Sequence, residues 1–323
     1  MLAERVDGEI VASTRAMATE VTVKVAPVAR PHDSNDTGTA VHWALEAFHE
    51  VERACTRFDP SSPLMRANAS PTRWHRVPPV LFRALEEASR AHQRTAGRFD
   101  PRVLEDLIAL GYDRTLAFSN GDITTPQRAV RHSSRQRRAP WRPRFRGGSL
   151  EVFLGEAVDL GGIGKGLAVR WSGERLAAVT PNFLIEAGGD CYCAGVAPDG
   201  AGWRVGIEDP VGGREPLAVL SLSDRAVTTS SIKLRRWRAG DELVHHLIDP
   251  RTRRPGGGNL AAVTVVGKDP AAAEVDSKTL FLYGHQEIAR AARRHGLAAL
   301  WVDVRGEIGC SDNMKGFVLW QRP

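Results

Sequence analysis

The sequence lacks any long hydrophobic run. Although 42% of its 323 residues are hydrophobic, no stretch approaches the roughly 20 consecutive apolar residues that a membrane-spanning helix needs. The opening MLAERVDGEIVASTRAM carries charges where a secretory signal peptide has an apolar segment. These absences predict a folded chain without a membrane span, which we expect to be cytoplasmic. Its length is sufficient for a large hydrophobic core.

Cysteine is scarce, and its spacing excludes the common zinc and redox patterns. The four cysteines are Cys55, Cys191, Cys193 and Cys310. No CxxC pair and no cysteine–histidine set has zinc-ligand spacing, and the cytosol keeps thiols reduced. We interpret all four as packing residues.

Acidic residues are absent from one segment, between Arg128 and Arg146, that contains eight arginines. The chain carries a net charge of +6, so without these eight arginines the remainder would carry −2. The basicity therefore belongs to this segment rather than to the whole protein. Pro140 and Pro143 interrupt it, which predicts an exposed or partly disordered basic insertion at about 124–148.

Two aromatic residues, Trp141 and Phe145, lie between these arginines, as stacking residues do in proteins that bind single-stranded nucleic acids. The guanidinium groups could neutralise the phosphates of such a partner. A solvated insertion explains the same composition without a ligand, and we favour it. We therefore expect that nucleic acid is not a partner.

Hydrophobic periodicity predicts helices early in the chain and strands later. Residues 20–25 (EVTVKV) alternate as a strand does, and apolar residues spaced by three and four from 41 to 58 describe an amphipathic helix. A second helix is predicted after Pro79. From residue 151 onward strand-like segments dominate, with helices after Gly166, from about 270 to 283 and from 286 to 295. This irregular alternation predicts an α+β fold with mixed, mostly antiparallel sheets and packed helices.

The glycine-rich stretch DLGGIGKGLAVRW (159–171) matches neither common phosphate-loop signature. A Walker loop needs a glycine five residues before its Gly-Lys pair and a Ser or Thr after it, but Asp159 and Gly166 occupy those positions. The dinucleotide fingerprint needs a third glycine where Leu167 stands. What is present is an acid after a strand, glycines, and Lys165 near a helix start. Such a turn favours an anion, although similar turns also occur without a ligand.

Further short motifs follow this stretch and precede it. LIEAGGD (184–190), AVTTSS (226–231) and HHLIDPRT (245–252) come after it, in that order. Before it come MATEVTV (17–23), TRFDPSSPLMRAN (56–68) and TAGRFDP (95–101). Together with DLGGIGKG, these motifs resemble those of the ApbE-type FAD:protein FMN transferases in the same order. The resemblance covers almost the whole chain and implies a single flavin transferase domain over residues 1–323.

The resemblance implies an activity and its participants. Family members cleave FAD and attach FMN through a phosphoester to a threonine of a client flavoprotein, with release of AMP. FAD is then the substrate, Mg²⁺ the metal cofactor and the client flavoprotein the partner. By resemblance His246 takes the threonine proton, which suits a side chain that titrates near neutrality. The side chain of His245 would point to the opposite face of a strand. The residues implied to contact FAD are Met17, Phe58, Arg98, Phe99, Asp100, Asp159, Lys165, Thr229 and Ile248.

The implied metal site departs from the family pattern. By resemblance, Gly162 offers its carbonyl to the metal, but AEVDSKTLF (273–281) has Glu274 where the best-known members have Asp and Lys278 where they have Thr. Glu274 can ligate a hard cation, whereas a protonated lysine cannot. Three accounts are open. Asp276 supplies the missing oxygen, Lys278 is itself the cation beside the pyrophosphate, or the site has lost its metal and holds only FAD.

Two functions are therefore weighed. The first is an active FAD:protein FMN transferase, which His246, Asp159 and Lys165 favour. The alternative is a protein that binds or hydrolyses FAD but has lost the transfer activity, which Lys278 at the metal position would explain.

Overall fold

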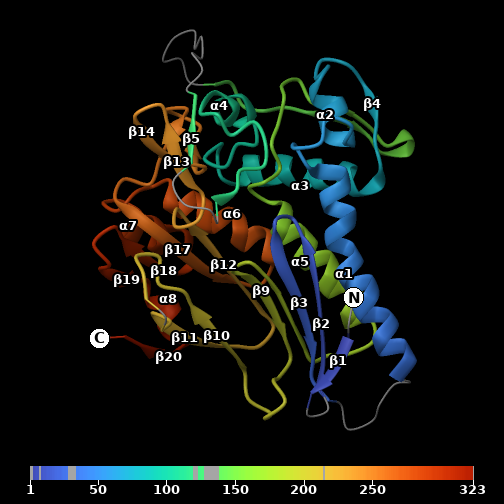
Figure 1. Ribbon diagram of the computed structural model, residues 1–323, viewed down its shortest axis with the longest axis vertical. Helices are drawn as coiled ribbons and strands as arrows, with labels where there is room; N and C mark the ends of the chain where they lie inside the picture. The colour runs from blue at the N-terminus through green and yellow to red at the C-terminus, as the bar shows by residue number, and fades with distance from the viewer. Residues whose placement is uncertain are drawn as a thin grey trace.

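A nine-stranded antiparallel sheet forms the centre of the computed structural model, which describes residues 3–6, 9–27, 34–118, 123–126, 138–213 and 215–322 (Figure 1). One of its strands has the alternating sequence TEVTVKV, whose three valines are buried. In order across the sheet the strands are β1 (Ala3–Val6), β2 (Glu9–Ala16), β3 (Thr19–Val25), β8 (Phe183–Ala187), β9 (Asp190–Ala194), β12 (Arg225–Ser231), β17 (Leu260–Gly267), β18 (Ala298–Asp303) and β19 (Ile308–Cys310).

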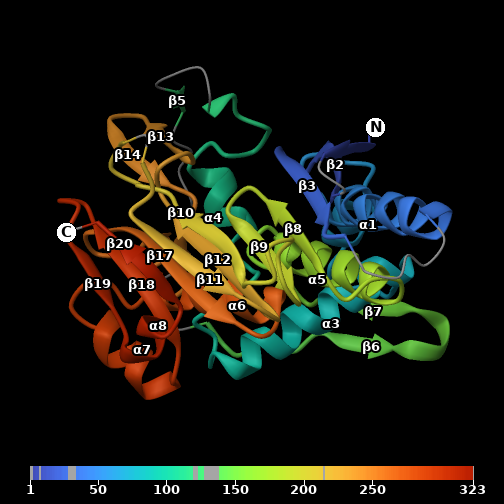
Figure 2. The same cartoon turned by 90° about the horizontal axis from the view of Figure 1, so that it is seen from below.

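Helices cover one face of this sheet (Figure 2). α1 (Ser34–Cys55), α5 (Gly164–Ala177) and α6 (Pro270–Phe281) pack against its strands, and α3 (Pro79–Arg94) packs against α1. The sequence sets the start of α6, because the Asp269 side chain accepts a hydrogen bond from the Ala272 amide and proline follows it. The remaining helices are α2 (Pro63–Asn68), α4 (Leu104–Ala109), α7 (Ile288–His295), α8 (Asp312–Lys315) and the 3-10 helix η2 (Gly147–Ser149).

A small sheet covers part of the opposite face. Its order is β10 (Trp203–Ile207), β11 (Ala218–Leu222) and β20 (Val318–Gln321). Successive side chains of β8 point to opposite faces of the central sheet. Phe183 and Ile185 pack in the core on the helical face, and Leu184 packs in the core under the small sheet. The other short strands are β4 (His75–Arg76), β5 (Thr124–Thr125), β6 (Arg144–Arg146), β7 (Glu151–Phe153), β13 (Arg236–Ala239), β14 (Glu242–His245), β15 (Ile248–Asp249) and β16 (Arg254–Pro255).

The predicted α+β class with mostly antiparallel sheets is confirmed. Some element boundaries differ from the predictions, as two examples show. The helix predicted to reach residue 58 ends at Cys55, so that Phe58 lies in the loop beyond it. The strand predicted from EVFLGEAVDL covers only Glu151–Phe153, because the chain turns at Gly155, where φ is +78°. Among the described helices, none combines the length and apolar character of a membrane span.

The described end of the basic segment packs into the protein, while residues 127–137 lie outside the described residues. The Trp141 side chain is 2% exposed, and its indole N–H donates to the Leu154 carbonyl over 2.9 Å. Its backbone amide donates to Nε2 of His92 over 3.0 Å. Phe145 also packs against the helical core. The expectation that Trp141 is a solvated residue or a base-stacking one is therefore wrong, because this indole is a core side chain.

The four cysteines are free, as the packing interpretation expects. Cys55, Cys191 and Cys193 are buried, and Cys310 is partly exposed. Burial raises the pKa of Cys55 and of Cys193 to about 12. The pKa of Cys191 also lies well above its ordinary value, chiefly because of burial. The three buried thiols are thus poor nucleophiles at neutral pH.

Candidate functional site

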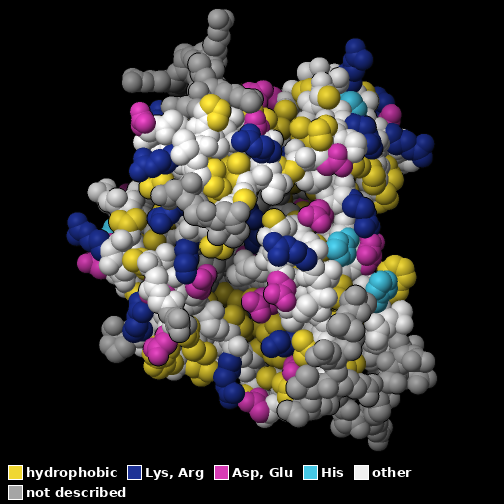
Figure 3. All heavy atoms as spheres, viewed as in Figure 1, with side chains coloured by type: hydrophobic (Ala, Val, Ile, Leu, Met, Phe, Trp, Pro, Cys, Tyr) yellow, Lys and Arg dark blue, Asp and Glu magenta, His cyan; other side chains and the backbone are white. Residues whose placement is uncertain are grey.

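A cavity of about 1400 Å³ lies beside the N-terminus of α5. Its wall combines the β2–β3 turn, the loop that follows α1, the loop at 98–101, β10 and α6. The face seen in Figure 3 is hollowed near its centre, and hydrophobic and basic side chains border the hollow. The volume exceeds the roughly 300–1000 Å³ of sites for drug-sized ligands. The cavity therefore has room for a dinucleotide.

The cavity brings together twelve of the thirteen predicted site residues, which come from segments far apart in the sequence. Only Asp276 is not part of its wall. The twelve are Met17, Phe58, Arg98, Phe99, Asp100, Asp159, Gly162, Lys165, Thr229, His246, Ile248 and Glu274.

The glycine-rich stretch forms a tight turn against the cavity. The backbone amide of Asp159 donates to the Pro101 carbonyl over 2.7 Å, and its carboxylate accepts from the Gly161 amide. A Cβ on Gly162 would lie 3.0 Å from the Phe99 ring, a tight contact that the ring could relieve only by shifting. Glycine at this position lets the backbone lie close to both the ring and the cavity.

Lys165 projects from the first turn of α5 and forms an ion pair with Asp190. Asp190 ends the LIEAGGD motif and is 1% exposed. Its second oxygen accepts from the Thr229 amide over 3.3 Å. Burial raises the pKa of Asp190, and the ammonium group of Lys165 opposes that rise. The sequence motif contained Asp190, but only the fold reveals that it holds Lys165.

Lys278 projects from α6 and pairs with Glu274 one helical turn earlier, with 2.9 Å between Nζ and Oε1. The other oxygen of Glu274 accepts from the Gly166 amide over 2.7 Å. Burial opposes ionisation of Glu274, but Lys278, Lys165 and the Gly166 amide outweigh it and hold its pKa below the ordinary value. The side chains of Lys165 and Lys278 thus line the same cavity, each fixed by a buried carboxylate.

The residues here do not fit a magnesium ion. Asp276 lies away from the cavity and binds Arg94, with 2.6 Å between Oδ1 and Nη1, so it does not supply the missing oxygen. Glu274 is already engaged by an ammonium group and an amide. Within the described part of the chain, no group of three or more His, Cys, Asp or Glu side chains is arranged to hold a metal. Mg²⁺ prefers oxygen ligands, so a lysine in this position opposes its binding.

The two adjacent histidines have different surroundings, although only His245 lies in a strand, at the end of β14. His246 lines the cavity, and its Nδ1 lies 3.4 Å from the Arg235 carbonyl oxygen. Because a carbonyl only accepts hydrogen bonds, this contact favours the tautomer with a proton on Nδ1 and a free lone pair on Nε2. Burial, with Arg235 and Lys278, holds the pKa of His246 well below its ordinary value. His245 instead packs edge-on against Phe281.

The cavity also has an aromatic and basic corner that the sequence interpretation captured only in part. Phe58 is 38% exposed and lies 5.5 Å from the Tyr112 ring. Arg57 lies over both rings, and its Nε is 2.9 Å from the Asp159 carboxylate. Its Nη2 is buried without a hydrogen-bond partner. Arg57 directly precedes the selected Phe58, and Tyr112 belongs to no quoted motif, so sequence reasoning missed both.

Three other predicted residues support the wall in different ways. Asp100 lies in the wall, but its carboxylate is held by Arg102 over 2.7 Å. Arg98 lies 3.7 Å from the centre of the Tyr283 ring. The prediction that Met17 lies in the opening strand is wrong. This residue occupies the β2–β3 turn with φ of +54°, followed by Ala18 with φ of +59°, which is the paired left-handed geometry of a tight hairpin.

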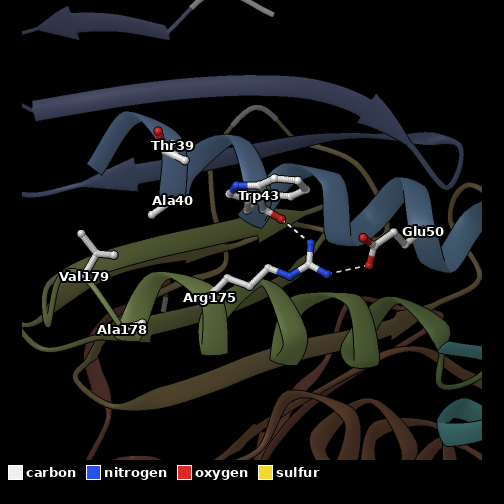
Figure 4. Close-up of a pocket in the computed structure, with 7 residues that line it drawn as sticks. All are labelled: Thr39, Ala40, Trp43, Glu50, Arg175, Ala178 and Val179. Atoms are coloured by element: carbon white, nitrogen blue, oxygen red, sulfur yellow. Dashed lines mark hydrogen bonds and ion pairs between the residues drawn. The ribbon is translucent and has the colours of Figure 1, made fainter. Parts of the chain in front are cut away.

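A second cavity of about 580 Å³ lies between α1 and the end of α5 and contains no predicted site residue. Figure 4 shows Arg175 reaching across it, where the guanidinium group donates to the Trp43 carbonyl and pairs with Glu50 over 2.6 Å. These contacts join the two helices. We interpret this cavity as a groove between packed helices.

Comparison with known proteins gives the same assignment for most of the chain. Residues 17–301 match the ApbE family. The FAD:protein FMN transferase of Salmonella typhimurium is 30% identical over 174 residues, which are 51% of this chain and 46% of that protein. The chain thus spans about half the length of this relative. The FAD:protein FMN transferase of Klebsiella pneumoniae is 25% identical over 288 residues, 84% of this chain and 77% of that protein.

Solved structures share the fold. The ApbE protein of Thermotoga maritima superposes with a TM-score of 0.80 at 23% identity, over 98% of this chain and all of that one. The flavin transferase ApbE of Vibrio cholerae gives a TM-score of 0.76 at 22% identity, with the same coverage. With the family match over residues 17–301, the conclusion is that this chain belongs to the ApbE family.

Proposed function

We propose that this chain is an FAD:protein FMN transferase, which attaches FMN to a threonine of a client flavoprotein and releases AMP. The observation that carries the proposal is the convergence of twelve motif residues from distant segments on one cavity. The names of its relatives support the same activity. The partner is then a flavoprotein with an acceptor threonine, and the substrate is FAD.

In the proposed reaction the threonine oxygen forms a bond to the phosphorus of the FMN moiety. The bond from that phosphorus to the bridging oxygen breaks, and AMP leaves with this oxygen. The threonine proton passes to Nε2 of His246. A base with a low pKa is unprotonated at neutral pH and ready to accept this proton.

Phosphoryl transfer depends on positioning and on positive charge beside the phosphate oxygens. Lys165 and Lys278 are cations of this chain that line the cavity. Because the donor set does not fit Mg²⁺, no step is assigned to a metal ion. Asp159 would act by holding the glycine-rich turn and Arg57 in place, and Gly162 would face the pyrophosphate end of FAD. Phe58, with its exposed ring, would contact the flavin or the adenine.

The proposal is tested by incubating the chain with FAD and candidate client flavoproteins. We expect a fluorescent covalent flavin adduct on the client and stoichiometric AMP. The His246→Gln variant should form no adduct but still bind FAD, whereas His245→Gln, the matched control, should retain transfer. Release of AMP and FMN without an adduct would instead indicate FAD hydrolysis. Neither AMP nor adduct with any client would contradict the proposal.

A further inference from the structure

We infer that the ammonium groups of Lys165 and Lys278 bind the diphosphate of FAD in place of a divalent metal ion. The inference deepens the proposed function and rests on it for the identity of the ligand. It predicts that the diphosphate subsite of this chain works in the absence of Mg²⁺.

The first support is the placement of the two lysines. Lys165 comes from the first turn of α5 and Lys278 from α6, and both line the cavity beside Gly162. The Cδ of Lys278 lies 3.5 Å from where a Gly162 Cβ would be. The Lys278 side chain therefore lies against the glycine-rich turn, and Lys165 projects from the helix that begins there. The N-terminus of α5, a 14-residue helix, adds its partial positive charge on the same side.

The second support is that each ammonium group is fixed in place and keeps donors for a ligand. Lys278 pairs with Glu274, which is 1% exposed, and Lys165 pairs with Asp190, which is also 1% exposed. An ammonium group has three N–H donors. Each lysine uses one on its carboxylate, so two remain for phosphate oxygens. Buried partners also limit the rotamer freedom that would be lost on binding.

The third support is that the same arrangement opposes a metal ion. A divalent cation near Glu274 would have to displace the ammonium group that lies 2.9 Å from Oε1. It would also lie beside a second ammonium group, that of Lys165, and cation–cation repulsion is strong away from bulk water. Asp276, the other acid of this helix turn, is engaged by Arg94. The positive charge at this position is therefore supplied by the Lys278 side chain and not by a bound metal ion.

The charges of the cluster balance while the cavity holds no anion. Two carboxylates, Glu274 and Asp190, face two ammonium groups. The N-terminus of α5 lies beside this balanced cluster, so its partial positive charge is in excess where the diphosphate would bind.

The test is FAD binding by calorimetry, with EDTA and with MgCl₂, on the wild-type chain and on variants. The Lys278→Met change alone would leave Glu274 as a buried unpaired charge, so the principal variant combines Lys278→Met with Glu274→Gln. Riboflavin, which has no phosphate, reports whether the flavin pocket is intact. The control is Lys315→Met, because Lys315 forms its ion pair with Asp312 on an exposed helix.

We expect wild-type affinity for FAD to be the same in EDTA and in MgCl₂. The double variant should bind FAD about 10- to 100-fold more weakly, which is the usual cost of losing one charge-assisted hydrogen bond. Its affinity for riboflavin should be unchanged. Wild-type binding that requires a divalent ion would overturn the inference, as would a double variant that binds FAD normally. Metal-free binding without any client adduct would sustain the inference and contradict transferase activity. No FAD binding in either buffer would overturn both.

Discussion

Replacement of Gly166 by alanine tests whether the contact between α5 and α6 sets the geometry of the cavity. A Cβ on Gly166 would lie 2.7 Å from the Ala271 Cα and 2.7 Å from the Pro270 carbonyl oxygen. Both are backbone atoms, which cannot rotate away as a side chain can. Overpacking of this kind costs about 1–3 kcal/mol, and the better helix propensity of alanine offsets about 1 kcal/mol. Because the clash is with backbone, we expect a net loss of about 1–2 kcal/mol.

The matched control lies on the same helix. A Cβ on Gly173 would lie 3.5 Å from the Tyr192 ring, which is ordinary contact, so Gly173→Ala should stabilise the chain by up to about 1 kcal/mol. Urea unfolding followed by tryptophan fluorescence measures both changes. Calorimetry should also show weaker FAD binding for Gly166→Ala, since its amide donates to Glu274. Equal stability of the two variants, with unchanged FAD binding, would refute the reasoning.

Three further results are expected. Transfer should stay nearly constant as pH falls from 8 to 6.5, because the lowered pKa of His246 keeps this base neutral, and a rate that halves near pH 6.5 would contradict the assignment. Burial lowers the pKa of His245 from 6.5 to about 4. As the pH falls from 6.5 to 4, His245 is therefore protonated in the unfolded chain but not in the folded one, and the free energy of unfolding decreases. That loss is at most about 3 kcal/mol, and urea titrations at both pH values should show it reduced in His245→Gln. Trp141→Ala should cost about 3–5 kcal/mol of unfolding free energy, whereas a change near zero would mean that Trp141 is not a core residue.

Sequence patterns predicted several elements correctly. The helices after Pro79 and Gly166 and the strand FLIEA lie where the patterns indicate. Periodicity failed at Phe58, which continues the apolar spacing of α1 although the helix has already ended. An apolar residue three positions on has the same spacing whether it faces a core or a cavity. The pattern therefore cannot distinguish the two.

Motif order predicted which residues meet at the cavity, but it could not predict their partners. Asp276 and Glu274 are two residues apart on α6, so their side chains point to different sides of the helix, and only Glu274 reaches the cavity. The Arg57 side chain is held by contacts with Tyr112 and Asp159, which are distant from it in the sequence. Such contacts follow from tertiary packing and leave no local signal.

The buried position of Trp141 determines where this chain can be shortened for biochemical work. Arg102 binds Asp100 in the cavity wall and also donates to the Ala139 carbonyl over 2.9 Å. The Trp141 amide meanwhile donates to His92. A deletion that removes the whole basic segment would therefore remove a core indole and two hydrogen bonds behind the cavity wall. An internal deletion in the basic segment, made to obtain a protein for assays or crystallisation, must therefore leave residue 138 and those after it in place.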